Sequence, residues 1–165
     1  MEYYDIISPG YDELHKEEQL KKYMIIQKNL GIGEDNTLLD VGCGTGLSSE
    51  IFNCRIMGIE PSREMMKKKK TSEKADFFQG RAEHLPFKDR AFDVIICVTA
   101  IHNFENPRKA LEEMKRVGKG KGAITILRKA RKAQELRTLV EEMFKMEKVV
   151  EEDKDSILFF STGSY

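Results

Sequence analysis

The stretch LLDVGCGTG, residues 38–46, constrains the fold of this chain more than any other feature. Its apolar start is typical of a short buried strand, and three glycines at every second position predict a tight turn directly after it. A glycine loop between a strand and a helix lets the backbone approach a ligand closely, and it directs unpaired helix N–H groups at negative charge. The stretch therefore predicts a strand, turn and helix that bind a ligand.

Strands and helices are expected to alternate along the rest of the 165 residues. Apolar runs predict the strands, whereas helical spacing of apolar residues and capping residues predict the helices. The sequence DKD between two strand-like runs predicts a C-terminal hairpin. The expected strands cover 37–41, 55–60, 75–80, 92–100 and 122–127, and the expected helices cover 12–30, 46–53, 61–70, 107–117 and 129–144.

This alternation predicts an α/β fold, with a Rossmann-like, doubly wound, mostly parallel seven-stranded sheet and an antiparallel edge strand from the C-terminal β-hairpin. Parallel neighbours need crossover connections, and these are usually helical. Ligands of such sheets bind at the carboxyl ends of the strands, where the strand order reverses. We expect a single domain over 1–165, with an N-terminal arm and helix in 1–31 and the ligand-binding core in 32–165.

Composition argues against several classes of protein. Lys and Arg number 28, as do Asp and Glu, so the summed charge gives no reason to expect DNA binding or strong attraction to anionic lipid. The three cysteines lack CxxC spacing and no acidic cluster has metal-ligand spacing, so we expect neither disulfides nor a metal. No apolar run approaches the roughly 20 residues of a membrane span, and no signal peptide is evident. A reducing cytoplasm is the expected location.

Details of the glycine motif distinguish between the ligands that this fold can bind. A dinucleotide fingerprint that begins at Gly42 needs glycine at position 47, where the chain has Leu47. Asp40 lies inside the first strand, where an acid is unfavourable unless it meets a cation or hydrogen-bond donors. Glu60, at the end of the second strand, can accept two hydrogen bonds from a ribose diol. These residues favour a ligand with an amino acid at one end and a nucleoside at the other.

Four segments together resemble the class I S-adenosylmethionine-dependent methyltransferases. They are LLDVGCGTG, the strand ending GIEPS, the loop GRAEHLPF, and FDVIICVTAIHNF followed by NPRKALEEMKRV. The resemblance is closest to the type 11 group, which contains the quinone-biosynthesis C-methyltransferases and many small-molecule enzymes. It covers nearly the whole chain and implies S-adenosylmethionine as cofactor, with S-adenosylhomocysteine as its product.

The resemblance also implies which residues bind the cofactor. The Gly42–Gly46 backbone would hold the methionine moiety, with Asp40 near its ammonium group, and Glu60 would accept the ribose hydroxyls. Tyr4 and Tyr11, from the N-terminal arm, would close over the cofactor. The full expected set is Asp40, Gly42, Cys43, Gly44, Thr45, Gly46, Glu60, Pro61 and Met65 (both against the adenine), Ala82 and Glu83 (beside the adenine edge), Val98 and Thr99 (beside the methionine), and Tyr11.

Arg81 departs from the pattern of this family. Many relatives carry an acid immediately before the position of Ala82, where it accepts a hydrogen bond from the adenine amino group. A guanidinium has no acceptor and cannot replace that acid. Glu83 or a backbone carbonyl would have to accept the bond instead.

Methyl transfer from a sulfonium is an in-line displacement, so the protein contributes mainly by positioning the acceptor. If the acceptor must lose a proton, His102 is the expected general base; the alternative is that it shapes the acceptor pocket or packs under the loop. The compact chain and its charge balance favour a small-molecule acceptor. An RNA or protein acceptor, with an activator subunit, is the alternative, and a nicotinamide-dependent protein of the same fold is a third. A homodimer or a partner subunit would complete the acceptor pocket.

Overall fold

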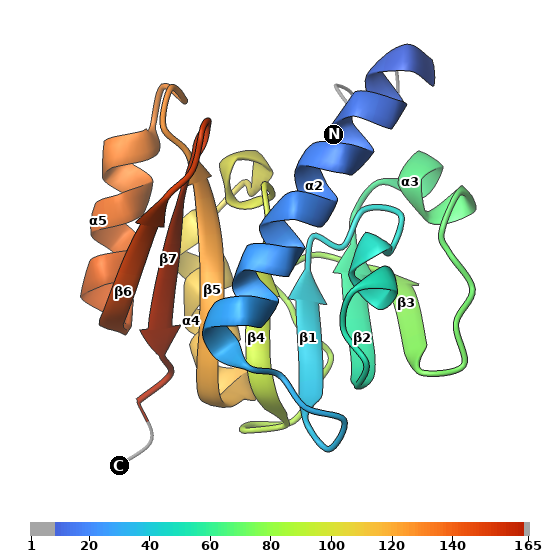
Figure 1. Cartoon of the computed structure of the whole chain (residues 1–165). Coiled ribbons are helices and arrows are strands. Elements are labelled where there is room, and N and C mark those ends of the chain that lie inside the picture. The colour runs from blue at the N-terminus through green and yellow to red at the C-terminus, as the bar shows by residue number, and fades with distance from the viewer. Residues whose placement is uncertain (1–8, 164–165) are drawn as a thin grey trace.

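The computed structural model of the chain describes residues 9–163, and the side chains of 13–163. In these residues seven strands form one sheet in the order β3-β2-β1-β4-β5-β7-β6 (Figure 1). The elements are α2 (Pro9–Leu30), β1 (Thr37–Val41), the 3-10 turn η1 (Leu47–Glu50), β2 (Arg55–Glu60), α3 (Arg63–Lys67), β3 (Ala75–Gln79), β4 (Phe92–Cys97), the 3-10 turn η2 (Ile101–Asn103), α4 (Pro107–Val117), β5 (Gly118–Leu127), α5 (Ala133–Met143), β6 (Lys145–Glu151) and β7 (Asp155–Ser161).

The sheet is doubly wound, which confirms the predicted fold class. β1 pairs in parallel with β2 on one side and with β4 on the other, so the strand order reverses between β1 and β4. The β2–β3 and β4–β5 pairs are parallel too. The C-terminal hairpin forms one edge of the sheet, where the antiparallel strand β7 lies between β5 and the outermost strand β6.

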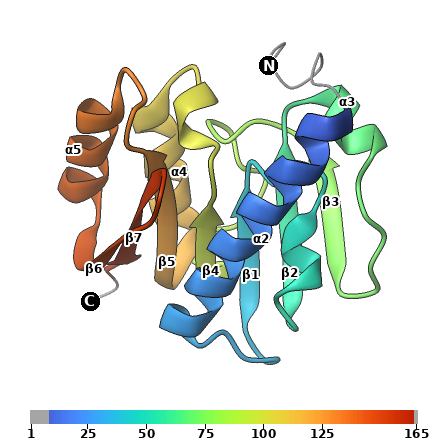
Figure 2. The same ribbon diagram turned by 45° about the horizontal axis from the view of Figure 1, so that its top comes forward.

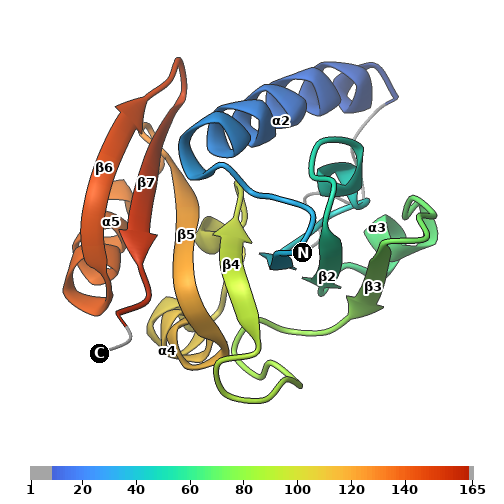
Figure 3. The same cartoon turned by 60° about the horizontal axis from the view of Figure 1, so that its bottom comes forward.

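Helices cover both faces of the sheet because neighbouring residues of its central strands point into two separate apolar cores (Figure 3). In β4, Val94 and Ile96 pack on the face covered by α2, together with Ile26. Ile95 and Cys97 pack on the opposite face, against residues of α4 and α5. A strand that is buried on both faces reads as a continuous apolar run, and this is the pattern of residues 94–98. Along the described part of the chain, no helix combines the length and apolar character needed to cross a membrane.

Several element boundaries differ from the predicted ones: α2 begins at Pro9 and β5 at Gly118, both earlier than expected, and α3 is shorter than expected. Three further differences have local reasons. The helix expected at 46–53 is only the single turn η1, since Gly46 enters it with φ 84° and few residues separate it from β2. The strand expected at 92–100 ends at Cys97, because Thr99 has φ 54°, which is outside strand geometry. The helix expected at 129–144 begins at Ala133, with no side-chain cap at its start.

Two helix starts agree with the capping residues in the sequence. Ser62 Oγ accepts a hydrogen bond from the N–H of Met65 at 3.2 Å, and Asn106 Oδ1 accepts one from the N–H of Lys109 at 3.1 Å. Such side-chain caps satisfy backbone donors that a helix leaves unpaired at its first turn. They fix the chain direction immediately after β2 and after η2, which are two of the segments that border the ligand-binding edge.

Lys22 anchors α2, which runs diagonally across one face of the sheet (Figure 2). Its Nζ lies 2.8 Å from Asp155 Oδ2, and these side chains are 7% and 1% exposed. The same Nζ donates to Gln19 Oε1 at 3.1 Å and to Thr99 Oγ1 at 2.7 Å. Thr99 in turn donates its N–H to Thr125 Oγ1 at 2.8 Å. One buried ammonium group therefore joins α2 to the segment after β4 and to the start of β7.

Lys22→Met should destabilise the protein by about 3–5 kcal/mol, because it leaves the buried carboxylate of Asp155 without its cation. Lys21→Met is the matched control, since Lys21 pairs with Glu152 at 2.8 Å but its side chain is 61% exposed. The control should change stability far less. Urea unfolding of the two variants measures the difference, and equal losses would contradict the anchoring role of Lys22.

Candidate active site

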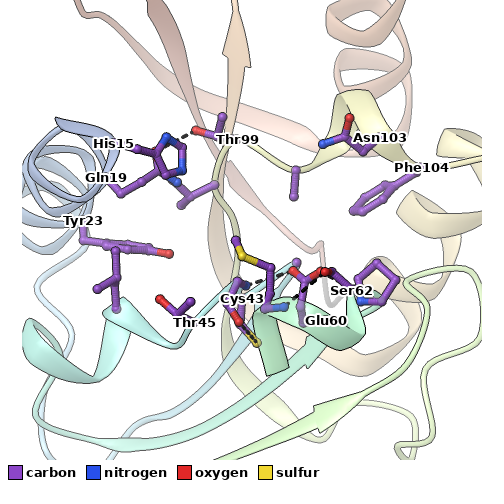
Figure 4. Close-up of a pocket in the computed structure, with 17 residues that line it drawn as sticks. His15, Gln19, Tyr23, Cys43, Thr45, Glu60, Ser62, Thr99, Asn103 and Phe104 are labelled. Carbon is purple, nitrogen blue, oxygen red and sulfur yellow. Dashed lines mark hydrogen bonds between the residues drawn. The ribbon is translucent and has the colours of Figure 1, made fainter. Parts of the chain in front are cut away.

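A cleft opens at the carboxyl ends of β1 and β4, where the strand order reverses; together with the open solvent at its mouth it measures about 720 Å³. Its wall combines the glycine loop after β1, the residues after β2, the turn after β4 and one face of α2 (Figure 4). The lining residues are His15, Gln19, Tyr23, Gly42, Cys43, Gly44, Thr45, Leu47, Glu60, Pro61, Ser62, Met65, Val98, Thr99, Ala100, Asn103 and Phe104.

The glycine loop packs closely against neighbouring segments, and two of its positions leave no room for a side chain. Gly42 has φ 76°, and a Cβ there would lie 2.3 Å from the Cβ of Ala100. Gly46 has φ 84°, and a Cβ there would lie 2.6 Å from the ring of Phe77. Glycine adopts these left-handed conformations without the strain that other residues suffer. Gly42 thus brings bare backbone to the cleft, whereas Gly46 serves the packing of the loop on β3.

Four backbone N–H groups of this loop bond within the protein, contrary to the expectation that they point at a negative ligand. Those of Gly42 and Cys43 both donate to the carbonyl oxygen of Ile59, at 2.7 and 3.0 Å. The N–H of Gly46 donates to the carbonyl of Cys43 at 2.9 Å, and that of Gly44 donates to a side chain described next. Because these four N–H groups already donate to acceptors within the protein, the loop differs from phosphate-binding loops, whose N–H groups donate to a bound anion.

Glu60 fastens the glycine loop to the end of β2. Its Oε1 accepts a hydrogen bond from the N–H of Gly44 at 2.9 Å, and its Oε2 accepts one from the N–H of Ser62 at 2.8 Å. The side chain is buried, yet it lines the cleft. A carboxylate offers about four acceptor sites, so the group that holds the loop is also of the kind that accepts from hydroxyl groups.

Asp40 lies beneath the glycine loop, fully buried in β1. Neither of its carboxylate oxygens has a hydrogen-bond partner among residues 13–163. Burial raises the pKa of Asp40 to about 7, which the nearby Ser48 hydroxyl opposes and the charge of Glu60 reinforces. Because a buried acid is unfavourable without a cation or donors, this position fits a ligand that brings positive charge to the loop above it.

The cleft brings together most of the residues that the sequence singles out. Those on its wall are Gly42, Cys43, Gly44, Thr45, Glu60, Pro61, Met65, Val98 and Thr99. Ala82 and Glu83 line a second hollow, which shares Pro61, Asn103 and Phe104 with the cleft. The backbone of Tyr11 belongs to the first turn of α2, but its side chain and the whole of Tyr4 lie outside the described residues.

His102, the expected general base, is not brought to the cleft. Its Nε2 accepts a hydrogen bond from the N–H of Leu127 at 2.8 Å, next to the end of β5. Burial lowers the pKa of His102, although the carboxylate of Asp155 opposes the shift. A neutral imidazole whose ring nitrogen accepts from the backbone fits the alternative of packing under the loop after β4. This arrangement does not place it to take a proton from an acceptor in the cleft.

The part of the wall that α2 supplies was not predicted from the sequence. His15, Gln19 and Tyr23 line one side of the cleft (Figure 4). Their spacing of four residues puts them on one face of a helix, and this is the one signal that could have found them. Asn103 and Phe104, at and just after η2, were also missed, because nothing local shows toward which side a 3-10 turn directs its residues.

Comparison with known proteins identifies the family. The methyltransferase domain family matches residues 39–126, which are just over half of the chain and run from β1 to β5. The chain belongs to this methyltransferase family. This agrees with the resemblance to the type 11 group that the sequence motifs indicate.

Two relatives illustrate how much of such proteins this methyltransferase-family chain covers. An uncharacterized protein of Methanocaldococcus jannaschii is 37% identical over 123 residues, which are 73% of this chain and 48% of that protein. A demethylmenaquinone methyltransferase of Paenarthrobacter aurescens is 31% identical over 133 residues, which are 74% of this chain and 52% of the enzyme. The chain therefore spans about half the length of the curated relatives it matches.

Solved structures share its fold over most of the chain. A SAM-dependent methyltransferase from Aquifex aeolicus has a TM-score of 0.73 at 20% identity, over 86% of this chain and 89% of that one. A chain from the complex of the Haloferax volcanii Trm112 methyltransferase activator has a TM-score of 0.77 at 15% identity, over 94% of this chain and 95% of that one. At these identities the likeness is one of fold.

The raised pKa of Asp40 predicts a specific pH dependence of stability. Because this pKa rises from 3.8 to about 7 on folding, the folded state keeps a proton that the unfolded state loses between these values. The contribution of Asp40 to the free energy of unfolding should therefore decline from about pH 4 to pH 7 and level off above. Asp40→Asn lacks this contribution, so the variant should gain stability relative to the wild type across that window. Chemical denaturation at successive pH values measures the difference, and a constant difference would contradict the assignment.

Proposed function

We propose that this chain is an S-adenosylmethionine-dependent methyltransferase that acts on a small-molecule acceptor. Its membership of the methyltransferase family supports the reaction class. The observation that carries the proposal is the glycine loop itself, in which four N–H groups bond internally while an unpaired acid, Asp40, lies beneath it. Such a loop suits the positively charged end of an amino acid better than a phosphate.

The residues around the loop fit the rest of this cofactor. Asp40 would offset the ammonium group of the methionine moiety, and Glu60 would accept hydrogen bonds from the ribose hydroxyls. Pro61 and Met65, which line the cleft beside Glu60, would contact the adenine. Leu47, also on the wall, occupies the position where a dinucleotide fingerprint needs glycine, and this supports a ligand without a pyrophosphate.

The bound cofactor supplies a methyl group on a sulfonium, and the protein's own residues would orient the acceptor and exclude water. In-line displacement depends chiefly on such positioning. The side chains of α2 and the turn at Thr99 form the wall that faces the loop. If the acceptor must lose a proton, His15 is the imidazole that lines the cleft in the described part of the chain. We therefore prefer His15 to His102 as the candidate base.

The lining of the cleft supports an acceptor that is small and carries little charge. Among the described residues, Glu60 is the one Asp, Glu, Lys or Arg on the wall. The other polar groups, which include His15, Gln19 and Asn103, alternate with apolar ones such as Phe104. The positive charge of a bound sulfonium and the negative charge of Glu60 would offset each other. The cleft would then have no strong electric field to attract a charged acceptor. The similarity to a demethylmenaquinone methyltransferase supports a small acceptor as well.

A second candidate is an RNA or protein methyltransferase that works with an activator subunit. It is supported by the fold likeness to the Haloferax volcanii chain, which is bound to the Trm112 methyltransferase activator. In this version a partner subunit would complete the acceptor side of the cleft. A second copy of this chain is the alternative partner.

Cofactor binding should raise the melting temperature of the protein. A ligand at about 100 times its Kd stabilises by about 2.7 kcal/mol, which for a chain of this length is roughly 5–10 °C. S-adenosylhomocysteine should produce such a rise in a thermal shift assay and NADH should not. A rise with NADH and none with S-adenosylhomocysteine would favour the nicotinamide-dependent alternative and overturn the proposal.

The acceptor class can be tested by incubating the protein with cell extract and methyl-labelled S-adenosylmethionine. The small-molecule, RNA and protein fractions are then separated and counted. We expect label in the small-molecule fraction, with a Glu60→Ala variant as the control for enzyme-dependent transfer. Label confined to RNA or protein would support the second candidate instead.

A further inference from the structure

The second hollow at the sheet edge continues the cleft and has a charged rim. It shares Pro61, Asn103 and Phe104 with the cleft, and Ala82 lies on its wall. A planar base attached to a ribose at Glu60 would pass Pro61 and enter this hollow. Under the proposed function that group is the purine of the cofactor, and the inference that follows rests on that function.

Adenine, the purine of this cofactor, has an exocyclic amino group, which needs a hydrogen-bond acceptor. Arg81, on the rim of the hollow, has donors alone. Glu83 is almost fully buried, and its Oε2 already accepts a hydrogen bond from the N–H of Asn106 at 3.1 Å. This bond holds Glu83 to the segment that begins α4, and the burial of its side chain limits how far the carboxylate can turn toward a base in the hollow.

Glu105 supplies the remaining carboxylate of the hollow. Arg81 Nη2 donates to its Oε2 at 2.8 Å, whereas the same nitrogen lies 3.7 Å from Glu83 Oε2. The side chain of Glu105 is 81% exposed, so a base in the hollow can reach it without disturbing the core. Apart from Arg81, the described residues give Glu105 no partner, and its second oxygen can accept from a ligand.

We propose that Glu105, oriented by Arg81, is the residue that recognises the amino group of the nucleobase. The basic residue at position 81 and the acid at position 105 together take over a task that a single acid before Ala82 could perform. The pair joins two of the segments that line the hollow, since Arg81 follows β3 and Glu105 follows η2. Specificity for adenine over a base with a carbonyl at the same position then depends on a carboxylate, which accepts from an amino group and repels a carbonyl oxygen.

The test compares binding of S-adenosylhomocysteine and S-inosylhomocysteine, in which a carbonyl oxygen replaces the base amino group, by isothermal titration calorimetry. The wild type should prefer the adenosyl compound by about tenfold or more. Glu105→Gln should bring the ratio of the two Kd values close to one, because an amide both accepts and donates. Arg81→Ala should lower the ratio by a smaller factor, because it frees Glu105 to move.

Glu142→Gln is the matched control, since Glu142 is an exposed acid paired with Arg108 at 3.6 Å on the surface of α5. It should leave the ratio unchanged. An unchanged ratio in Glu105→Gln, or a lowered ratio in Glu83→Gln alone, would overturn the role of Glu105. Absence of binding by either compound to the wild type would instead overturn the proposed function on which the inference rests.

Discussion

The close approach of the glycine loop to its neighbours is the constraint on which the rest of the structure depends. The ring of Phe77, from β3, fills the space that Gly46 and Gly58 leave free, and a Cβ at these glycines would lie 2.6 and 2.5 Å from it. On the other side, Gly42 leaves no room between its backbone and Ala100. The loop is therefore fixed between β3 and the turn after β4. Glu60 then secures it from β2, so its position does not depend on a ligand.

The opposite wall of the cleft depends on a buried charge. Thr99 is β-branched and has a left-handed backbone, a conformation that such residues rarely adopt without compensation. Its hydroxyl accepts from Lys22 and donates to Gln19 at 3.0 Å, and both partners belong to α2. Lys22 in turn is held by Asp155. The strained turn and the helix thus stabilise one another, and together they define the side of the cleft where an acceptor would approach.

Local sequence patterns predicted the order of strands and helices and the position of the glycine loop. These features depend on neighbouring residues: an apolar run before glycines, Ser62 and Asn106 at helix starts, and a hairpin turn near the C-terminus. The features that were not predicted depend on contacts between distant segments. Lys22 meets Thr99 and Asp155, which lie far along the chain, and the orientation of His102 is set by Leu127 of β5.

The internal use of the loop's N–H groups was likewise beyond the sequence, because it depends on how β1 and β2 pair. Both Gly42 and Cys43 donate to Ile59, a residue of the neighbouring strand. The motif alone left open whether the loop would hold an anion or the amino-acid end of a cofactor. Because strand pairing uses the N–H groups of Gly42 and Cys43, and Asp40 has no partner below the loop, the structure favours the amino-acid end of a cofactor.

A crystal structure of the protein with S-adenosylhomocysteine tests the central claim most directly. We predict that the ribose hydroxyls lie within hydrogen-bond distance of the Glu60 carboxylate and that the amino-acid end of the ligand lies on the glycine loop above Asp40. A nucleoside bound elsewhere, or bound in the cleft with its ribose away from Glu60, would contradict it.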